Sequence, residues 1–198
     1  MPARIKDTAL GRPYYDVLGL SMAHALGGAE EEADPYVLSL LEREYIAWAI
    51  ALYYQCAHCQ THHRARIVAL QKKSSEPLWA WERSIVLAVV FSRLKLEEVS
   101  DLERRVWIEQ WDRFVRQLGD EHGRTVALIL YAIAYARDDK ELVKLVFEKL
   151  VALCCDRSKL RGVVRDVSRV TLAMKGSTSA FRVGDLIMTL LDEAEKGG

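Results

Sequence analysis

Five residues of three types that support redox chemistry fall within a stretch of twenty residues. The segment Cys56–Cys59 reads Cys-Ala-His-Cys, His63 follows four residues later, and Glu44 lies twelve residues before the first cysteine. A thiol reacts at neutral pH only after losing its proton, so it needs a nearby base and a route for that proton. The imidazoles and the carboxylate supply both if the fold brings them to the thiols. The spacing therefore indicates thiol chemistry.

Helical spacing brings Cys56, Cys59 and His63 together. Their offsets of zero, three and seven residues lie on one face of an α-helix. If that helix begins near Cys56, its unsatisfied amide groups and its dipole favour a thiolate at the first cysteine. Arg64 and Arg66 either add positive charge nearby or face the solvent.

The position of Glu44 predicts a bend in the chain. In one unbroken helix, the twelve residues between Glu44 and Cys56 would separate them by about 18 Å along the axis. A carboxylate at Glu44 reaches the motif only if two helices lie side by side. The polar residue Gln55, after ten mostly apolar residues, marks the expected bend. Glu44 would then hold His63, fix its tautomer and raise its basicity.

Each polar residue of the motif also has an ordinary structural explanation. Glu44 can be a surface residue at the start of a helix, and so can Glu42. His62 is expected to be a surface neighbour of the motif. His58 can be a spacer between the cysteines.

Zinc binding is the main structural alternative. Cys56, Cys59 and His63 could provide three ligands to a zinc ion. The chain lacks a second pair at zinc-finger spacing, and Cys154 and Cys155 are adjacent, which is a poor geometry for chelating one tetrahedral ion together. We expect Cys154 and Cys155 to be small buried hydrophobic residues.

Two other cysteine motifs do not fit. Attachment of a c-type haem requires His directly after the second cysteine, and Gln60 occupies that place. A thioredoxin fold requires strands around the motif, whereas both flanks have a helical pattern.

The bulk composition indicates a globular protein without a strongly charged partner. Lys plus Arg and Asp plus Glu number 28 each, so no excess charge favours nucleic acid or an anionic membrane. No apolar run approaches the roughly 20 residues of a membrane helix, and the N-terminus lacks the pattern of a secretory signal. We therefore expect a cytoplasmic protein. In that compartment a Cys-x-x-Cys pair is more often catalytic, redox-active or metal-binding than a structural disulfide.

Helical periodicity along the chain, with weak strand signals, predicts an all-α fold in a single domain over residues 1–198. The motif hairpin is expected at about 36–71 and the C-terminal helices at about 121–195. Ser100 and Glu103 form a predicted capping box, and Gly119 and Gly176 are expected to end helices. The expected helices lie at about 13–25, 35–54, 57–71, 76–95, 100–118, 121–136, 139–155, 157–174 and 179–195.

A faint internal repeat indicates a duplicated helical hairpin. Ile46–Leu70 and Val126–Leu150 each contain an apolar run, a polar break and a second amphipathic run. Aligning the two apolar runs places Ala136, Asp139 and Val143 opposite Cys56, Cys59 and His63.

The motif as a whole resembles the AhpD-like alkyl hydroperoxidases of the carboxymuconolactone decarboxylase family. The family pattern is Glu, eleven residues, Cys-x-x-Cys, three residues and His, and this chain matches every position. His58 between the cysteines matches the AhpD proteins specifically. The resemblance covers Leu41–Leu70. The chain departs from the family at Gln55, where Gly is usual, and in its long tail beyond residue 120.

The resemblance implies an AhpD-like helical bundle and a role for each motif residue. Cys59 would attack the peroxide and become a sulfenic acid, and Cys56 would resolve it as a disulfide and supply a proton. His63, supported by Glu44, would be the base that activates Cys59. His58 would assist the proton relay.

The same resemblance implies an antioxidant, thiol-dependent peroxidase or disulfide reductase that needs no cofactor. Its substrate would be a small peroxide, and a lipoyl-bearing or thioredoxin-like dithiol protein would reduce its disulfide. The family also implies a homo-oligomer, either a trimer or a multiple of one. Two alternatives remain: a non-redox lactone decarboxylase that uses the acid–base residues, and a zinc-stapled helical interaction module that is not an enzyme.

Overall fold

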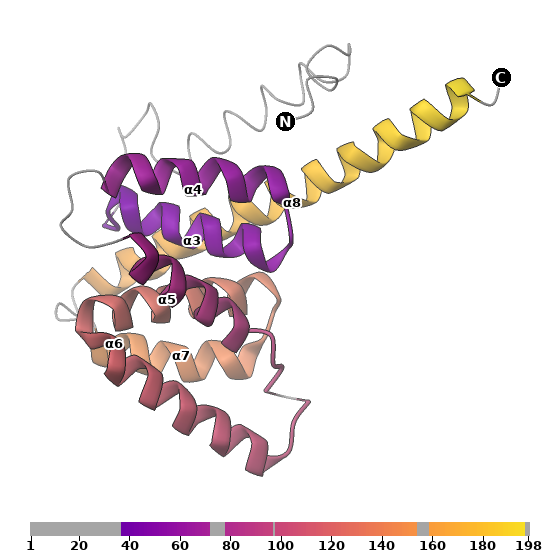
Figure 1. The fold of residues 1–198 in the computed structure, drawn as a ribbon. Coiled ribbons are helices and arrows are strands. Elements are labelled where there is room, and N and C mark those ends of the chain that lie inside the picture. The colour runs from indigo at the N-terminus through magenta and orange to yellow at the C-terminus, as the bar shows by residue number, and fades with distance from the viewer. Residues whose placement is uncertain (1–36, 72–77, 97, 154–158, 197–198) are drawn as a thin grey trace.

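The prediction of an all-α fold is confirmed. A computed structural model of the protein describes residues 37–71, 78–96, 98–153 and 159–196, and every regular element in these ranges is an α-helix (Figure 1). The expected helix at 13–25 lies outside the described residues, as do Cys154 and Cys155. The helices are α3 (Leu40–Tyr53), α4 (Ala57–Gln71), α5 (Leu78–Phe91), α6 (Asp101–Ala136), α7 (Lys140–Leu153) and α8 (Leu160–Lys196).

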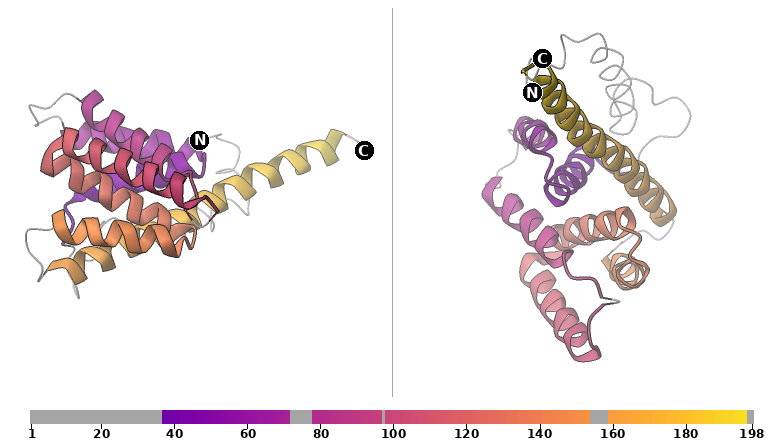
Figure 2. Two further views of the ribbon diagram at one scale, coloured as in Figure 1. Left: turned by 90° about the horizontal axis from the view of Figure 1, so that it is seen from below. Right: turned by 90° about the vertical axis from the view of Figure 1, so that its right-hand side faces the viewer.

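The central helix of the described bundle is α3. It packs against α4, α5, α6 and α8, while α6 also contacts α5, α7 and α8. The two views in Figure 2 show α8 running along the bundle and extending past it toward the C-terminus. None of the described helices combines the length and the apolar character that crossing a membrane would require.

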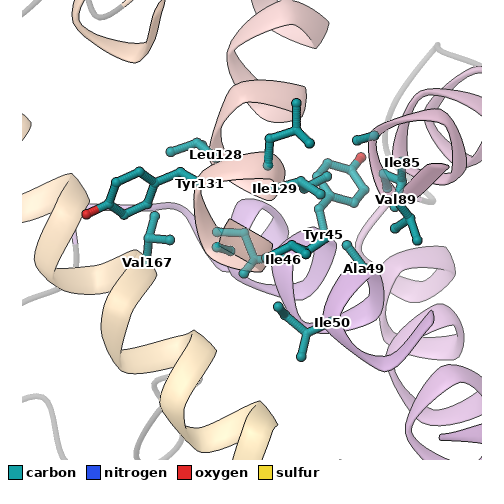
Figure 3. Close-up of a cluster of buried hydrophobic side chains, with 14 of the residues drawn as sticks. Tyr45, Ile46, Ala49, Ile50, Ile85, Val89, Leu128, Ile129, Tyr131 and Val167 are labelled. Carbon is teal, nitrogen blue, oxygen red and sulfur yellow. The ribbon is translucent and has the colours of Figure 1, made fainter. Parts of the chain in front are cut away.

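Burial on all sides distinguishes α3 from an ordinary amphipathic surface helix. All nine residues from Arg43 to Ala51 are buried. Figure 3 shows side chains of α3, such as Ile46 and Ile50, within a cluster that includes Ile85 of α5, Ile129 of α6 and Val167 of α8. A helix that is apolar around its circumference belongs in a core. The two charged side chains in this segment, Arg43 and Glu44, are therefore held inside the protein.

Local signals account for most helix boundaries. The predicted capping box is present, with the Ser100 hydroxyl accepting the amide hydrogen of Glu103 and the Glu103 carboxylate accepting that of Ser100. The predicted break at Gly119 is also present. With φ 75° this residue is non-helical, and it divides α6 into two halves that run in different directions (Figure 1).

The prediction that Gly176 ends a helix is wrong. The helix α8 continues through it from Leu160 to Lys196, joining two segments that the sequence pattern separates. Gly176 is exposed, and a glycine inside an exposed helix costs only about 1 kcal/mol relative to alanine. Ser177 and Thr178 directly after it are weak helix formers but are buried, so packing and not helix propensity carries α8 past Gly176.

A tight turn joins α3 to α4 at the predicted bend. After Tyr54, Gln55 adopts a left-handed conformation with φ 58°. The amide of Cys56 donates to the carbonyl of Ala51 at 3.0 Å, and the amide of Gln60 donates to the carbonyl of Cys56 at 2.9 Å. Glycine adopts positive φ without steric cost. Gln55 therefore holds a conformation that glycine would adopt without strain.

The same turn occurs again between α6 and α7. Asp138 has φ 60°, the amide of Asp139 donates to the carbonyl of Ala134 at 3.0 Å, and the amide of Val143 donates to the carbonyl of Asp139 at 2.9 Å. Every one of these positions lies 83 residues after its counterpart in the first turn. Asp139 therefore takes the place of Cys56.

The predicted register of the repeat is wrong by three residues. The structure puts Asp139 opposite Cys56, whereas alignment of the apolar runs puts it opposite Cys59. A shift of three residues is close to one helical turn, so it leaves most apolar positions on the same face. Periodicity alone consequently does not distinguish the two registers. The left-handed residue of each turn does.

We predict that Gln55→Gly stabilises the protein by about 1 kcal/mol, because a side chain in the left-handed region costs roughly 1–2 kcal/mol and glycine avoids that strain. Urea denaturation measures the effect. Gln110→Gly is the matched control: Gln110 is exposed inside helical α6, so its replacement should destabilise by about 1 kcal/mol. Destabilisation by both variants would contradict the strain at Gln55.

Candidate functional site

Glu44 and His63 meet inside the protein. Glu44 lies on α3 and His63 on α4, and His63 Nδ1 is 2.8 Å from Glu44 Oε2. Neither side chain has any exposed surface. Beside a carboxylate, Nδ1 carries the proton and donates it, which leaves Nε2 as the basic nitrogen. The contact expected from the sequence is thus present, and its catalytic role stays a prediction.

The second nitrogen of this imidazole has no partner among the described residues. Nε2 of His63 is buried and makes no hydrogen bond there. Leaving a buried polar atom without a partner costs about 1–3 kcal/mol, so such atoms need an explanation. A basic nitrogen held in this way is available to take a proton from a neighbouring group. His63 follows Cys59 by one helical turn on the same face of α4.

Arg66 completes this buried charge cluster. Its Nε lies 2.6 Å from Glu44 Oε1, and its side chain is 41% exposed whereas Glu44 is fully buried. The guanidinium thus offsets the cost of burying a carboxylate. Arg64 pairs instead with Glu82. Spacing in the sequence could have identified Arg66. Arg66 follows His63 by three residues and therefore lies on the same face of α4.

The two cysteines lie buried at the start of α4. Cys56 is 3% exposed and Cys59 is 1% exposed, and no disulfide joins them. The backbone amide of Cys59 donates to Cys56 Sγ at 3.3 Å. The hydrogen bond between the two thiol side chains, together with burial, raises the pKa of Cys59. The amide contact makes the Cys56 sulfur a hydrogen-bond acceptor at the start of α4.

Three imidazoles follow one another along α4. The rings of His58 and His62 are 6.4 Å apart, and those of His62 and His63 are 5.1 Å apart and perpendicular. The His62 side chain reaches the surface, yet desolvation of its inner part lowers its pKa, and the neighbouring His63 lowers it further. His62 is indeed at the surface, as the sequence indicates. The row of rings also connects that surface to the buried His63.

The zinc arrangement considered from the sequence is not formed. Within the described ranges, no group of three or more His, Cys, Asp or Glu side chains is arranged to hold a metal ion. The imidazole of His63 is directed to Glu44, which orients it for proton transfer.

Comparisons of the chain with protein-family models, with curated proteins and with solved structures found no match. A helical fold alone does not imply an activity, so the chemistry of the site is what bears on function. The site combines two buried thiols at a helix N-terminus with an imidazole whose basic nitrogen is unoccupied. Such an arrangement can remove a proton from a thiol and form a disulfide.

We predict that Glu44→Ala destabilises the protein by about 3 kcal/mol, because it removes the buried carboxylate that both His63 Nδ1 and the Arg66 guanidinium contact. Equilibrium urea denaturation measures the change. The control is Glu82→Ala, which breaks the partly exposed pair with Arg64 and should cost less than about 1 kcal/mol. Equal losses in the free energy of unfolding would mean that the buried contact with His63 stabilises the protein no more than the partly exposed pair does.

Proposed function

We propose that the protein is a thiol-dependent peroxidase or disulfide reductase that cycles Cys56 and Cys59 between dithiol and disulfide. The observation that carries this proposal is the buried Glu44–His63 contact, which leaves the Nε2 atom of His63 basic and unpartnered one helical turn beyond Cys59. A Glu–His contact that only stabilised the fold would need neither neighbouring thiols nor a buried ring nitrogen without a hydrogen bond. The resemblance of the motif to AhpD-like alkyl hydroperoxidases supports the same chemistry.

The reaction has three steps. A thiolate attacks one oxygen of the peroxide, the O–O bond breaks, and a sulfenic acid and an alcohol form. The second thiol then attacks the sulfenic sulfur, which gives a disulfide and water. An outside dithiol reduces the disulfide by exchange through a mixed disulfide. His63 takes the proton that the thiol releases on becoming a thiolate and returns it to the leaving alkoxide, which departs as the alcohol. The family resemblance assigns the first attack to Cys59 and the resolving step to Cys56.

Burial of both sulfur atoms bears on the substrate and the reductant. With 3% and 1% of the two residues exposed, a small hydroperoxide suits the site better than a bulky one. In keeping with the resemblance, the proposed reductant is a lipoyl-bearing or thioredoxin-like protein. An antioxidant role in the cytoplasm and a homo-oligomeric assembly, a trimer or a multiple of one, belong to the same proposal.

The proposal predicts that the reduced protein consumes one equivalent of a small organic hydroperoxide per chain and loses two thiols. Thiol titration and intact-mass measurement check this result. The background Cys154→Ser, Cys155→Ser leaves only the motif pair, because the chain has four cysteines. In that background Cys56→Ser and Cys59→Ser should each abolish the intramolecular disulfide. If activity toward a lactone survives complete thiol alkylation, the residues serve acid–base chemistry instead.

We also predict that His63→Gln lowers the rate of disulfide formation by roughly 10²-fold, the usual size of a general-base contribution. Stopped-flow measurement at fixed peroxide concentration gives the rate. His62→Gln is the matched control, since the His62 side chain reaches the surface, whereas His63 is the buried imidazole whose Nδ1 lies 2.8 Å from Glu44 Oε2. It should change the rate by less than about tenfold. A loss of equal size in both variants would remove His63 from its proposed role.

A further inference from the structure

Cys56 occupies the N-cap position of α4. The helix begins at Ala57, and the carbonyl of Cys56 accepts its first intrahelical hydrogen bond, from Gln60 at 2.9 Å. The sulfur accepts the amide hydrogen of Cys59, the third residue of the helix, at 3.3 Å. This is the contact that Ser, Asp or Asn side chains make at an N-cap. A neutral thiol is a weak acceptor, whereas a thiolate at a helix N-terminus is stabilised by the amide groups and the dipole.

The second turn of the same protein shows what this position accommodates. Asp139 stands where Cys56 stands, and its Oδ1 accepts the amide hydrogen of Leu142 at 2.9 Å. That carboxylate is 2% exposed and also pairs with Arg137. An identical backbone turn thus holds a buried anionic side chain over the third amide of its helix. In the first turn, Cys56 places its sulfur over the equivalent amide of α4, that of Cys59.

Cys59 has the opposite surroundings. It lies inside the first turn of α4, and its own amide points to the Cys56 sulfur. The hydrogen bond with the Cys56 side chain and the burial of the thiol raise the pKa of Cys59. A protonated Cys59 that donates to Cys56 further stabilises negative charge on Cys56.

We infer that Cys56, and not Cys59, is the thiolate that attacks first. This order reverses the roles that the family resemblance implies for Cys56 and Cys59. The inference deepens the proposed function, and the attack on peroxide rests on that function. The N-cap geometry and the Asp139 turn bear on which thiol is ionised at rest. They do so for any electrophile that the thiolate attacks.

The reversed order gives a balanced reaction. His63 takes the proton of Cys56, and the thiolate then attacks the peroxide. As the O–O bond breaks, Cys56 becomes a sulfenic acid and the leaving alkoxide takes the proton of Cys59, which yields an alcohol. The Cys59 thiolate attacks the sulfenic sulfur, the S–O bond breaks, and the departing hydroxide recovers the proton held by His63 as water. The products are a Cys56–Cys59 disulfide, an alcohol and water.

Alkylation of the reduced parent protein tests the resting thiolate without peroxide. A brief exposure to iodoacetamide at pH 7, followed by tandem mass spectrometry, measures how fast each cysteine is labelled, and the unfolded protein serves as the reference for equal access. We expect Cys56 to be labelled at least tenfold faster than Cys59. Labelling of Cys59 at an equal or higher rate would overturn the inference.

Trapping of the sulfenic acid tests the order of attack. With peroxide and dimedone, Cys59→Ser should accumulate adduct on Cys56, whereas Cys56→Ser should form adduct on Cys59 at least 100-fold more slowly. The reverse pattern would overturn the inference while leaving the proposed function intact. If the parent forms neither adduct nor disulfide, the peroxidase function fails, and the alkylation rates still decide which thiol is ionised. Circular dichroism confirms that both variants keep their helical content.

Discussion

The contact between the Glu44 carboxylate and the His63 imidazole constrains the rest of the structure. It buries a charged side chain on a helix that is surrounded by apolar neighbours, and such a charge is tolerated only when paired. Because the two residues lie on consecutive helices, the chain must reverse direction within a few residues. The strained conformation of Gln55 is the cost of that reversal, and the placement of both cysteines at the start of α4 is its result.

Sequence patterns predict the parts of this arrangement that depend on local interactions. The helical period, the capping box at Ser100 and the break at Gly119 each depend on residues close together in the chain. The meeting of Glu44 with His63 was predictable for another reason: no straight helix can bring a carboxylate across twelve residues to the motif.

Other features could not be predicted because several local answers were equally acceptable. Nothing nearby decides whether Arg66 faces the solvent or the carboxylate, since that choice depends on where α3 lies. The continuation of α8 through Gly176 depends on burial of Ser177 and Thr178, which is set by tertiary packing and not by the local sequence. The register of the repeated turn required the backbone angle at Asp138, which no side-chain pattern encodes.

The paired turns have a consequence for the redox equilibrium of the cysteine pair. In the turn that carries Asp139, the anionic acceptor is permanent, so the start of α7 does not depend on redox state. In the turn that carries Cys56, oxidation would replace the thiolate that we infer there by a neutral disulfide sulfur and so weaken the support of the first turn of α4. The helix therefore stabilises the dithiol form relative to the disulfide. A pair whose reduced form is stabilised in this way is the stronger oxidant, and it accepts electrons readily from a donor dithiol.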